Sequence, residues 1–216
     1  MNMSRNTIIE KLYNGFSQFP GFWEIDSIIC RATAGSPYRS ILIRNLNLSI
    51  GSTVLDMACG TGLNFPFLIN AVGSSGRIVG VDNSEKTLKL AKNRIARQNW
   101  SNVSINKLDG PEFNGKMVFD AALCTFAIEI ISPYRETIQT MIDSVKLKGR
   151  IGYIGFKYSK NPLLKMINPL WRIACLLGGG ADLERNVPEY LRQNMKEVFF
   201  KEVYAGFYYI GIYEKQ

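Results

Sequence analysis

The middle of the chain alternates short apolar runs with longer amphipathic stretches. Apolar runs of roughly four to eight residues between polar or glycine residues predict buried strands, and apolar positions every three to four residues predict helices. Five strands are expected in this way, at residues 53–59, 77–81, 103–107, 118–124 and 150–156. The helices between them are expected to end near residue 72, to run from Ser84 to about Arg97, and to cover about 133–145.

Different patterns flank this alternation. Residues 4–48 predict two or three helices, and residues 197–203 and 206–213 predict a hairpin. Strand-helix units that close with an antiparallel hairpin indicate a three-layer α/β sheet with helices on both faces. We expect one domain over 1–216, made of a helical N-terminal lid (1–48), a strand-helix core (49–156), an apolar insertion (157–195) and a C-terminal hairpin (196–216).

The composition narrows the chemistry, because the 216 residues include no histidine. Ser-His-Asp and Cys-His nucleophilic sites, histidine-dependent zinc sites and histidine-ligated haem are therefore excluded, and no metal is expected. The cysteines show no CxxC spacing and lie in apolar or glycine-rich contexts, which is typical of reduced thiols in a cytoplasmic protein. They are Cys30, Cys59, Cys124 and Cys175.

The net charge of +8 is spread along the chain rather than gathered in a basic tail. This spread disfavours nucleic acid as a partner and leaves peripheral contact with an anionic membrane open. The N-terminus has no uninterrupted apolar segment of the kind that forms a secretory signal. The apolar stretch 161–181 is interrupted by prolines, glycines and two cations, so it is not expected to span a membrane.

The first predicted strand runs into a glycine loop, Cys59-Gly60-Thr61-Gly62, and the second ends at Asp82. Glycines let a ligand approach the backbone closely, and a carboxylate at the end of the second strand can accept hydrogen bonds from both hydroxyls of a ribose. Phe65 stands where a dinucleotide fingerprint needs its third glycine, and no Walker lysine follows. Asp56, just before the loop, suits a ligand with a positively charged amino group.

The segments LDMACGTG and GVDNS resemble the class I S-adenosylmethionine-dependent methyltransferases, over about residues 36–156. The resemblance implies a Rossmann-like seven-stranded sheet with an antiparallel last strand. It also implies S-adenosyl-L-methionine as cofactor and S-adenosyl-L-homocysteine as product. The cofactor-binding residues that it implies are Tyr13, Tyr38, Asp56, Ala58, Cys59, Gly60, Gly62, Asn64, Asp82, Asn83, Ser84, Asp109, Gly110, Cys124 and Thr125.

The N-terminal helices resemble those of the small-molecule and lipid branch of this family, in which a tyrosine-containing helix lies over the cofactor. Tyr13 is then a positioning residue in catalysis, and Phe16 and Phe19 are further lid aromatics that contact the acceptor. Core packing of these aromatics is the alternative. The pair Tyr38-Arg39 matches a Tyr-Arg pair of the same branch, next to the cofactor carboxylate.

Methyl transfer needs aligned approach more than an acid or base, so a chain without histidine can perform it. Glu129 is a candidate proton acceptor, and an exposed glutamate at a helix start is the alternative. The insertion resembles bacterial phospholipid N-methyltransferases and membrane-associated thiol S-methyltransferases; Trp171, Arg185 and Tyr190 are its candidate acceptor residues. Phosphatidylethanolamine N-methylation is favoured slightly. A thiol, a quinone-type carbon and a nucleic acid remain alternative acceptors, and the oligomeric state is left open.

Overall fold

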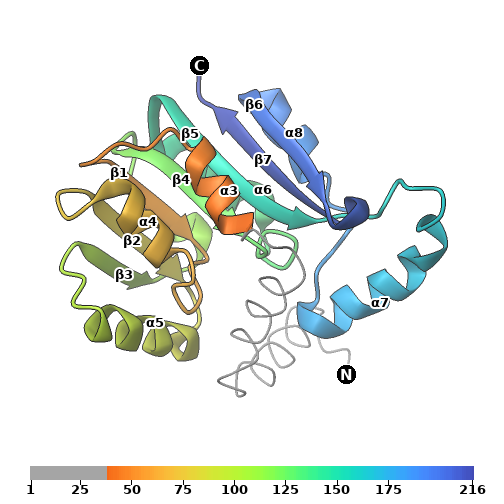
Figure 1. Ribbon diagram of the computed structural model, residues 1–216, viewed down its shortest axis with the longest axis horizontal. Coiled ribbons are helices and arrows are strands. Elements are labelled where there is room, and N and C mark those ends of the chain that lie inside the picture. The colour runs from red at the N-terminus through yellow and green to blue at the C-terminus, as the bar shows by residue number, and fades with distance from the viewer. Residues whose placement is uncertain (1–37) are drawn as a thin grey trace.

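The computed structural model describes residues 38–216, except for the side chains at 177–179, and shows one seven-stranded sheet with helices on both faces (Figure 1). The strands are β1 (Thr53–Met57), β2 (Arg77–Asp82), β3 (Val103–Lys107), β4 (Phe119–Thr125), β5 (Val145–Phe156), β6 (Lys196–Val203) and β7 (Tyr208–Glu214). The helices are α3 (Tyr38–Asn45), α4 (Phe65–Val72), α5 (Glu85–Arg97), α6 (Tyr134–Ser144), α7 (Asn168–Gly179) and α8 (Val187–Asn194), with short 3-10 turns η1 (Gly110–Glu112), η2 (Lys165–Ile167) and η3 (Tyr204–Gly206).

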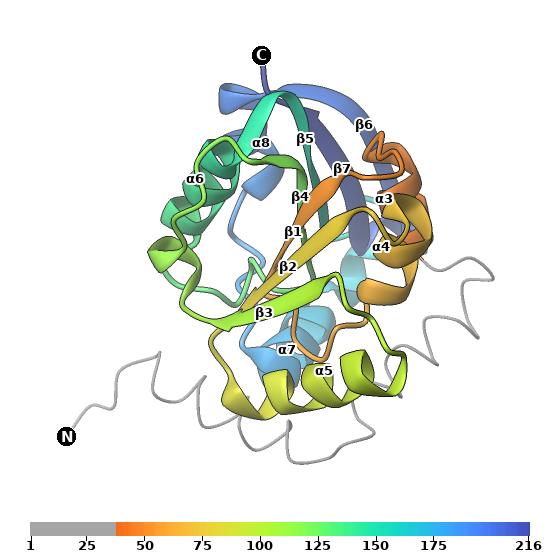
Figure 2. The same cartoon turned by 90° about the vertical axis from the view of Figure 1, so that its left-hand side faces the viewer.

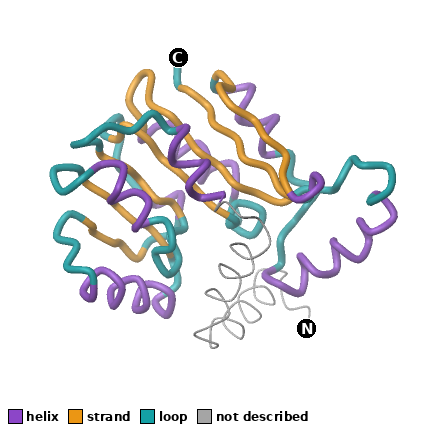
Figure 3. The backbone as a smooth tube through the Cα atoms, viewed as in Figure 1, coloured by secondary structure: helices purple, strands orange, loops and turns teal. Residues whose placement is uncertain are grey.

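The strand order is β3-β2-β1-β4-β5-β7-β6, in which only β7 runs antiparallel to both of its neighbours. The hairpin β6–β7 therefore closes one edge of the sheet (Figure 3). The chain builds outward from β1 to β3 and then returns to place β4 on the other side of β1. Such a reversal opens a crevice at the carboxyl ends of the strands, where open α/β sheets bind ligands. The predicted fold is confirmed.

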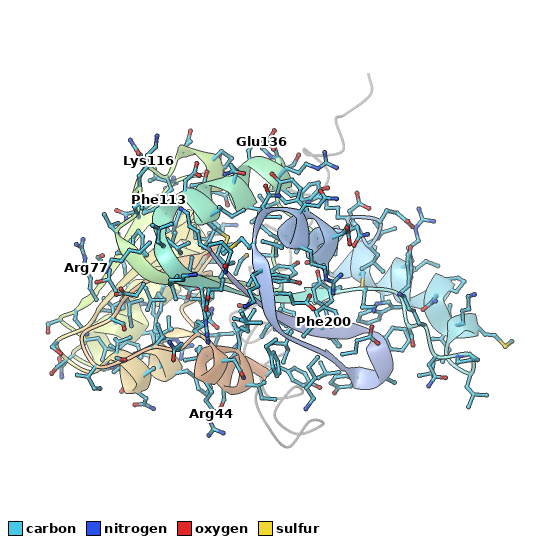
Figure 4. All side chains as sticks on the ribbon, turned by 90° about the horizontal axis from the view of Figure 1, so that it is seen from above. Arg44, Arg77, Phe113, Lys116, Glu136 and Phe200 are labelled. Carbon is cyan, nitrogen blue, oxygen red and sulfur yellow. The ribbon has the colours of Figure 1, made fainter. Side chains whose placement is uncertain are left out.

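Alternating side chains of each strand supply two hydrophobic cores, one on each face of the sheet. Val54 packs with α3, α4 and α5, whereas Leu55 and Met57 pack with α6 and α8. The two helix layers are seen edge-on in Figure 2. Charged side chains of the helices, such as Arg44 of α3, point outward (Figure 4). The amphipathic patterns thus decide which face of each helix is buried.

The observed strand ends lie within two residues of the sequence-based prediction except at the start of β5. β1 ends at Met57 instead of Cys59, because Ala58 turns into the left-handed region with φ 54°. β5 begins at Val145 rather than Arg150, since Val145 already pairs with Phe119 across a register shift in β4. Tyr13, Phe16, Phe19 and Cys30, and most of the predicted lid, lie outside the described residues.

Candidate functional site

The loop after β1 exposes its backbone because alternate residues adopt left-handed conformations. Ala58, Gly60 and Gly62 have φ values of 54°, 54° and 76°. A Cβ at Gly62 would lie 2.5 Å from the ring of Phe65, so the helix α4 packs directly against this turn. A Cβ at Gly60 would meet no protein atom within 4 Å and would enter open space. The loop is therefore shaped for close approach by a ligand.

Asp82 at the end of β2 ties two loops together. Its carboxylate accepts hydrogen bonds from the Gly60 amide (2.9 Å), the Ser84 amide (2.9 Å) and the Thr87 hydroxyl (3.0 Å). Burial raises the pKa of Asp82, and the Ser84, Gly60 and Thr87 hydrogen bonds oppose that rise. A buried carboxylate with this many donors is held in one orientation at the crevice.

Beyond Asp82, the polar edge of the site continues onto the ends of β2 and β3. Asn83 donates a hydrogen bond of 2.7 Å to a carboxylate oxygen of Asp109. Asp109 in turn caps the short turn η1, where its amide donates to Glu112 at 3.2 Å. These contacts orient both side chains along one wall of the crevice.

Asp56 lies behind the glycine loop in a buried polar network. Asn64 donates to Asp56 Oδ1 at 2.9 Å, and Arg39 donates to both Asn64 Oδ1 and the Thr125 hydroxyl at 2.6 Å. Asp56 Oδ2 has no hydrogen-bond partner within residues 38–216. Burial raises the pKa of Asp56 to about 7, opposed by Asn64 and Arg39. An unpartnered buried carboxylate oxygen is costly unless a further donor reaches it.

These elements surround a cavity of about 900 Å³. Its polar lining residues include Asp82, Asn83 and Asp109, which follow β2 and β3 on one side of β1, whereas apolar lining residues follow β4 on the other side of β1. The apolar wall comes from the segment after β4, which contributes Phe126, Ala127, Ile130 and Ile131. Two lysines of α5, Lys86 and Lys89, also line the cavity, which is large enough for a drug-sized ligand.

The apolar wall is fastened by two charged side chains that do not line the cavity. Glu129 is fully buried and accepts hydrogen bonds from Tyr153, from the Phe156 amide (3.1 Å) and from Tyr209 (3.4 Å). Burial raises the pKa of Glu129 to about 7. From the other side, Arg185 donates to the carbonyl oxygens of Ile128 (2.7 Å) and Ile131. The apolar wall is thus fastened to β5 and β7 through Glu129 and to the α7–α8 connection through Arg185.

The structure brings most of the predicted cofactor residues to the cavity. Those that line it are Ala58, Cys59, Gly60, Asp82, Asn83, Ser84, Asp109, Gly110 and Thr125. The predicted residues that do not appear in its lining are Tyr38, Asp56, Gly62, Asn64 and Cys124. Tyr38 packs against the rings of Tyr204 and Tyr208, and its neighbour Arg39 is the residue of that pair that reaches the cavity.

The predicted catalytic and acceptor residues that the structure describes, Glu129, Trp171, Arg185 and Tyr190, lie outside the cavity lining. Glu129 is neither an exposed helix-start glutamate nor a cavity residue, because the tyrosines of β5 and β7 enclose it. Trp171 packs on Phe156 and Phe207, and Tyr190 of α8 packs against the core. Arg185 is engaged by backbone carbonyls, as described above. None of these four side chains lines the cavity.

Some site residues were missed by the sequence prediction. Thr87 holds Asp82, and its position three residues after the N-cap Ser84 was a usable signal. Ile130 and Ile131 gave no signal, because an apolar side chain at a cavity wall has the same pattern as one in the core. The residues of the described chain include no cluster of acidic or cysteine side chains arranged to hold a metal ion.

Comparisons with known proteins agree with this architecture. Residues 54–149 match the family model described as "Methyltransferase domain". This part of the chain is therefore similar to methyltransferase domains. A demethylmenaquinone methyltransferase of Lactobacillus johnsonii is 24% identical over 149 residues, covering 68% of this chain and 61% of that protein. The corresponding enzyme of Bacillus cereus is 24% identical over 173 residues, 75% of this chain and 72% of its own length.

Solved structures share the fold of this chain. An S-adenosylmethionine-dependent methyltransferase from Aquifex aeolicus has a TM-score of 0.60 at 17% identity, covering 82% of this chain and 89% of its own. Geranyl diphosphate C-methyltransferase from Streptomyces coelicolor, solved with S-adenosyl-L-homocysteine, has a TM-score of 0.66 at 12% identity, covering 83% and 75%. The chain spans less than two thirds of the Lactobacillus johnsonii relative's length.

The residues of this crevice fit S-adenosylmethionine. The open space beside Gly60 admits a ligand against the loop backbone, and Asp82 stands across from it at the end of β2. The unpartnered oxygen of Asp56 suits a cationic donor such as an ammonium group. A cofactor with a ribose and an amino-acid end therefore matches the donors and acceptors of this crevice.

Proposed function

We propose that this protein transfers a methyl group from S-adenosylmethionine to a hydrophobic acceptor. The observation that carries the proposal is the division of one cavity into a polar side at the ends of β1 to β3 and an apolar side after β4. The polar side suits the cofactor, and the apolar wall suits an acceptor with a greasy body. Membrane contact, if it accompanies this activity, would deliver such an acceptor.

The chain's own residues divide the cofactor between them. Asp82 would hold the ribose, and the Asn83-Asp109 pair would face the adenine. Arg39 would attract the carboxylate of the methionine end, and Asp56, acting from behind the loop, would attract its ammonium group. The glycines at 60 and 62 would leave room for the cofactor backbone contacts. Tyr13 remains a predicted lid residue outside the described part of the chain.

The cofactor supplies an electrophilic methyl group on a positively charged sulfur. Displacement at that carbon depends on alignment, so the task of the protein is to position the acceptor and to exclude water. Burial holds the pKa of the Cys59 and Cys124 thiols well above the usual range, so both stay protonated and neither serves as a nucleophile. We assign Glu129 as a positioning residue that fastens the apolar wall.

A quinol-type ring methylated on carbon is the first candidate acceptor. The names of the Lactobacillus johnsonii and Bacillus cereus relatives support it, and so does Arg39, which lines the cavity 5.4 Å from the ring centroid of Phe126. A cation there would stabilise the negative oxygen of a ring hydroxyl whose proton has been lost, which makes the ring carbon nucleophilic.

Phosphatidylethanolamine methylated on nitrogen is the second candidate. The observation in its favour is the pair Lys86 and Lys89 in the cavity lining, where a lipid phosphate could pair with them. Arg185, a predicted acceptor residue, does not support this candidate, because its guanidinium donates to the Ile128 and Ile131 carbonyls. A small thiol would leave most of the apolar wall without a partner.

The test is transfer of a labelled methyl group to a panel of acceptors: a demethylated quinol, phosphatidylethanolamine vesicles, small thiols and RNA. We expect label in the organic phase with the quinol, and activity should vanish in Asp82→Ala. The matched control Asp143→Asn changes an exposed carboxylate of α6 outside the cavity and should remain active. Label on the ethanolamine nitrogen would select the second candidate, and label only on thiol or RNA would overturn both.

Loss of the cofactor contact should also appear in binding itself. Removing Asp82 deletes a buried carboxylate, and charge-assisted hydrogen bonds are worth about 1.5–3 kcal/mol each. We therefore expect the dissociation constant for S-adenosylmethionine to rise on the order of 100-fold, measured by calorimetry. An unchanged constant in a folded Asp82→Ala protein would contradict the cofactor placement.

A further inference from the structure

The insertion before the hairpin carries an exposed apolar helix face. Leu163, Met166, Leu170 and Ile173 are 85%, 87%, 66% and 53% exposed. Leu163 lies in the turn before η2, Met166 lies in η2, and Leu170 and Ile173 lie in α7, at a spacing of three, four and three residues. We call these four side chains the outer face of α7. Large apolar side chains gathered in this way, unlike single exposed ones, mark an interaction surface.

The opposite side of α7 packs against the rest of the protein, so the outer face of α7 is oriented toward solvent. Trp171 packs on Phe156 and donates its indole hydrogen to the Lys157 carbonyl at 3.2 Å. Cys175 belongs to a small core with Ile130, which also lines the cavity. Asn168 exchanges two hydrogen bonds of 3.1 Å with the backbone of Ser159, which fastens the start of the helix.

The position of α7 links this face to the proposed acceptor side. In Figures 1 and 4, α7 stands at the margin of the molecule, beyond the end of β5. Since its inner side touches Ile130 of the cavity wall, a surface that covers the outer face would lie beside the apolar half of the cavity.

Charge indicates what kind of surface this is. Lys160, Lys165 and Arg172 are exposed around the outer face, and no acidic residue occurs between positions 160 and 181. The helix α5, which lies along the same lower edge of the molecule as α7 in Figures 1 and 2, carries the exposed residues Lys86, Lys89, Lys92 and Arg97. Cations whose stems lie along an apolar stripe keep their charges at the level of lipid headgroups.

We propose that the outer face of α7 docks into the surface of an anionic lipid bilayer, with α7 in the plane of the interface. A second copy of this chain is the weaker occupant, because pairing two outer faces would bring their cations together without acidic partners. No helix between residues 38 and 216 is both long and apolar enough to cross a bilayer. The inference rests on the proposed function, since docking here would present a lipid-dissolved acceptor to the cavity.

Flotation of the purified full chain with vesicles tests the proposal. One set contains phosphatidylglycerol and phosphatidylcholine, and the other contains phosphatidylcholine alone. We expect binding to the anionic set that weakens with added salt, because screening reduces attraction to anionic headgroups. The double variant Leu170→Glu with Ile173→Glu should lose about tenfold or more in vesicle affinity, since charge replaces apolar burial on the docking face.

The matched control is Ile50→Glu with Leu147→Glu, which changes two side chains that are 71% and 62% exposed and outside α7. The control should bind vesicles as the natural chain does. The proposal would be overturned if the natural chain did not bind vesicles, or if the α7 variant bound them as well as the natural chain. It would also be overturned if the control lost as much vesicle affinity as the α7 variant. A dimer that only the α7 variant abolishes, in a chain that ignores vesicles, would identify a second copy as the occupant.

Failure of the docking and failure of the proposed function remain separate. Flotation is done without cofactor or acceptor, and S-adenosylmethionine binding is measured for each variant by calorimetry. The α7 variant should bind the cofactor normally. A natural chain that binds vesicles but shows no methyl transfer to any acceptor would remove the proposed function and leave the docking surface standing.

Discussion

The cavity has two halves, and each is organised around one fully buried carboxylate. Asp56 lies behind the polar half and Glu129 behind the apolar wall. Burial raises the pKa of both groups to about 7. Each keeps one oxygen without a hydrogen-bond partner in the described chain, Oδ2 of Asp56 and Oε2 of Glu129.

Their neighbours differ, and the difference separates binding from support. Asn64, eight residues along the chain, donates a hydrogen bond to Asp56. The nearby positive charge of Arg39 partly opposes the burial-driven rise of the Asp56 pKa. Glu129 is enclosed by Tyr153 and Tyr209, which are 24 and 80 residues away. A carboxylate within a charged network can accept a cationic ligand, whereas one enclosed by tyrosines fastens three segments of the fold.

The largest effect should come from releasing the apolar wall. Arg185→Met removes the donor to the Ile128 and Ile131 carbonyls, which we expect to lower the free energy of unfolding by about 2–3 kcal/mol. Misplacement of the acceptor should reduce kcat/KM on the order of tenfold, with the cofactor dissociation constant unchanged. Chemical denaturation, steady-state kinetics and calorimetry measure the three quantities.

The matched control for that variant is Arg192→Met in α8. Arg192 forms ion pairs with Glu189 and Glu197 at the surface and touches no wall carbonyl. Exposed pairs are worth roughly 0–1 kcal/mol, so the control should behave almost as the natural chain does. If Arg185→Met weakened cofactor binding as much as it reduced kcat/KM, the polar and apolar halves of the cavity would not be functionally separate.

A second effect should appear in the pH dependence of stability. Because the folded pKa values of Asp56 and Glu129 lie above their ordinary values of 3.8 and 4.5, the folded chain holds more protons than the unfolded chain up to about pH 7. The free energy of unfolding should therefore fall as pH rises toward 7, by up to about 1.4 kcal/mol per pH unit for each group. Asp56→Asn and Glu129→Gln should each flatten this slope.

Saturation with S-adenosylmethionine then tells the two carboxylates apart. An ammonium group beside Asp56 favours its charged form, so the cofactor should reduce the slope in the natural chain and in Glu129→Gln. It should leave the slope of Asp56→Asn unchanged. Denaturant titrations between about pH 5 and 7 measure these slopes. A cofactor effect that persists in Asp56→Asn would show that another group receives the ammonium.

The smallest expected effect concerns the loop backbone at Ala58. A left-handed conformation costs a non-glycine residue about 1–2 kcal/mol, and glycine removes this cost. Glycine also stabilises the unfolded chain by about 0.4–1 kcal/mol, because it has more conformational freedom there, and this offsets part of the gain. Ala58→Gly should thus raise the free energy of unfolding by about 0.5 kcal/mol. Ala127→Gly is the matched control, because Ala127 also lines the cavity but has no positive φ, and it should be slightly destabilising.

Much of this architecture was predictable because its signals are local. β1, β2 and β4 each contain a short apolar run, and Asp82 and the Gly60 loop lie at the ends of adjacent predicted strands. Parallel pairing of β1 with β2 then brings these two ends together without further information. The cofactor half of the cavity is accordingly the half that residue patterns describe best.

What the sequence determined by itself is the class of fold, with its antiparallel last strand, and the residues at the polar end of the cavity. Only the tertiary structure decided which apolar residues line the cavity, that Glu129 and Arg185 support this apolar wall from behind, and that the four side chains of the outer face of α7 are exposed. The physical reason is that burial depends on contacts between segments far apart in the chain. An apolar or charged residue carries the same local pattern whether those contacts enclose it or leave it at a surface.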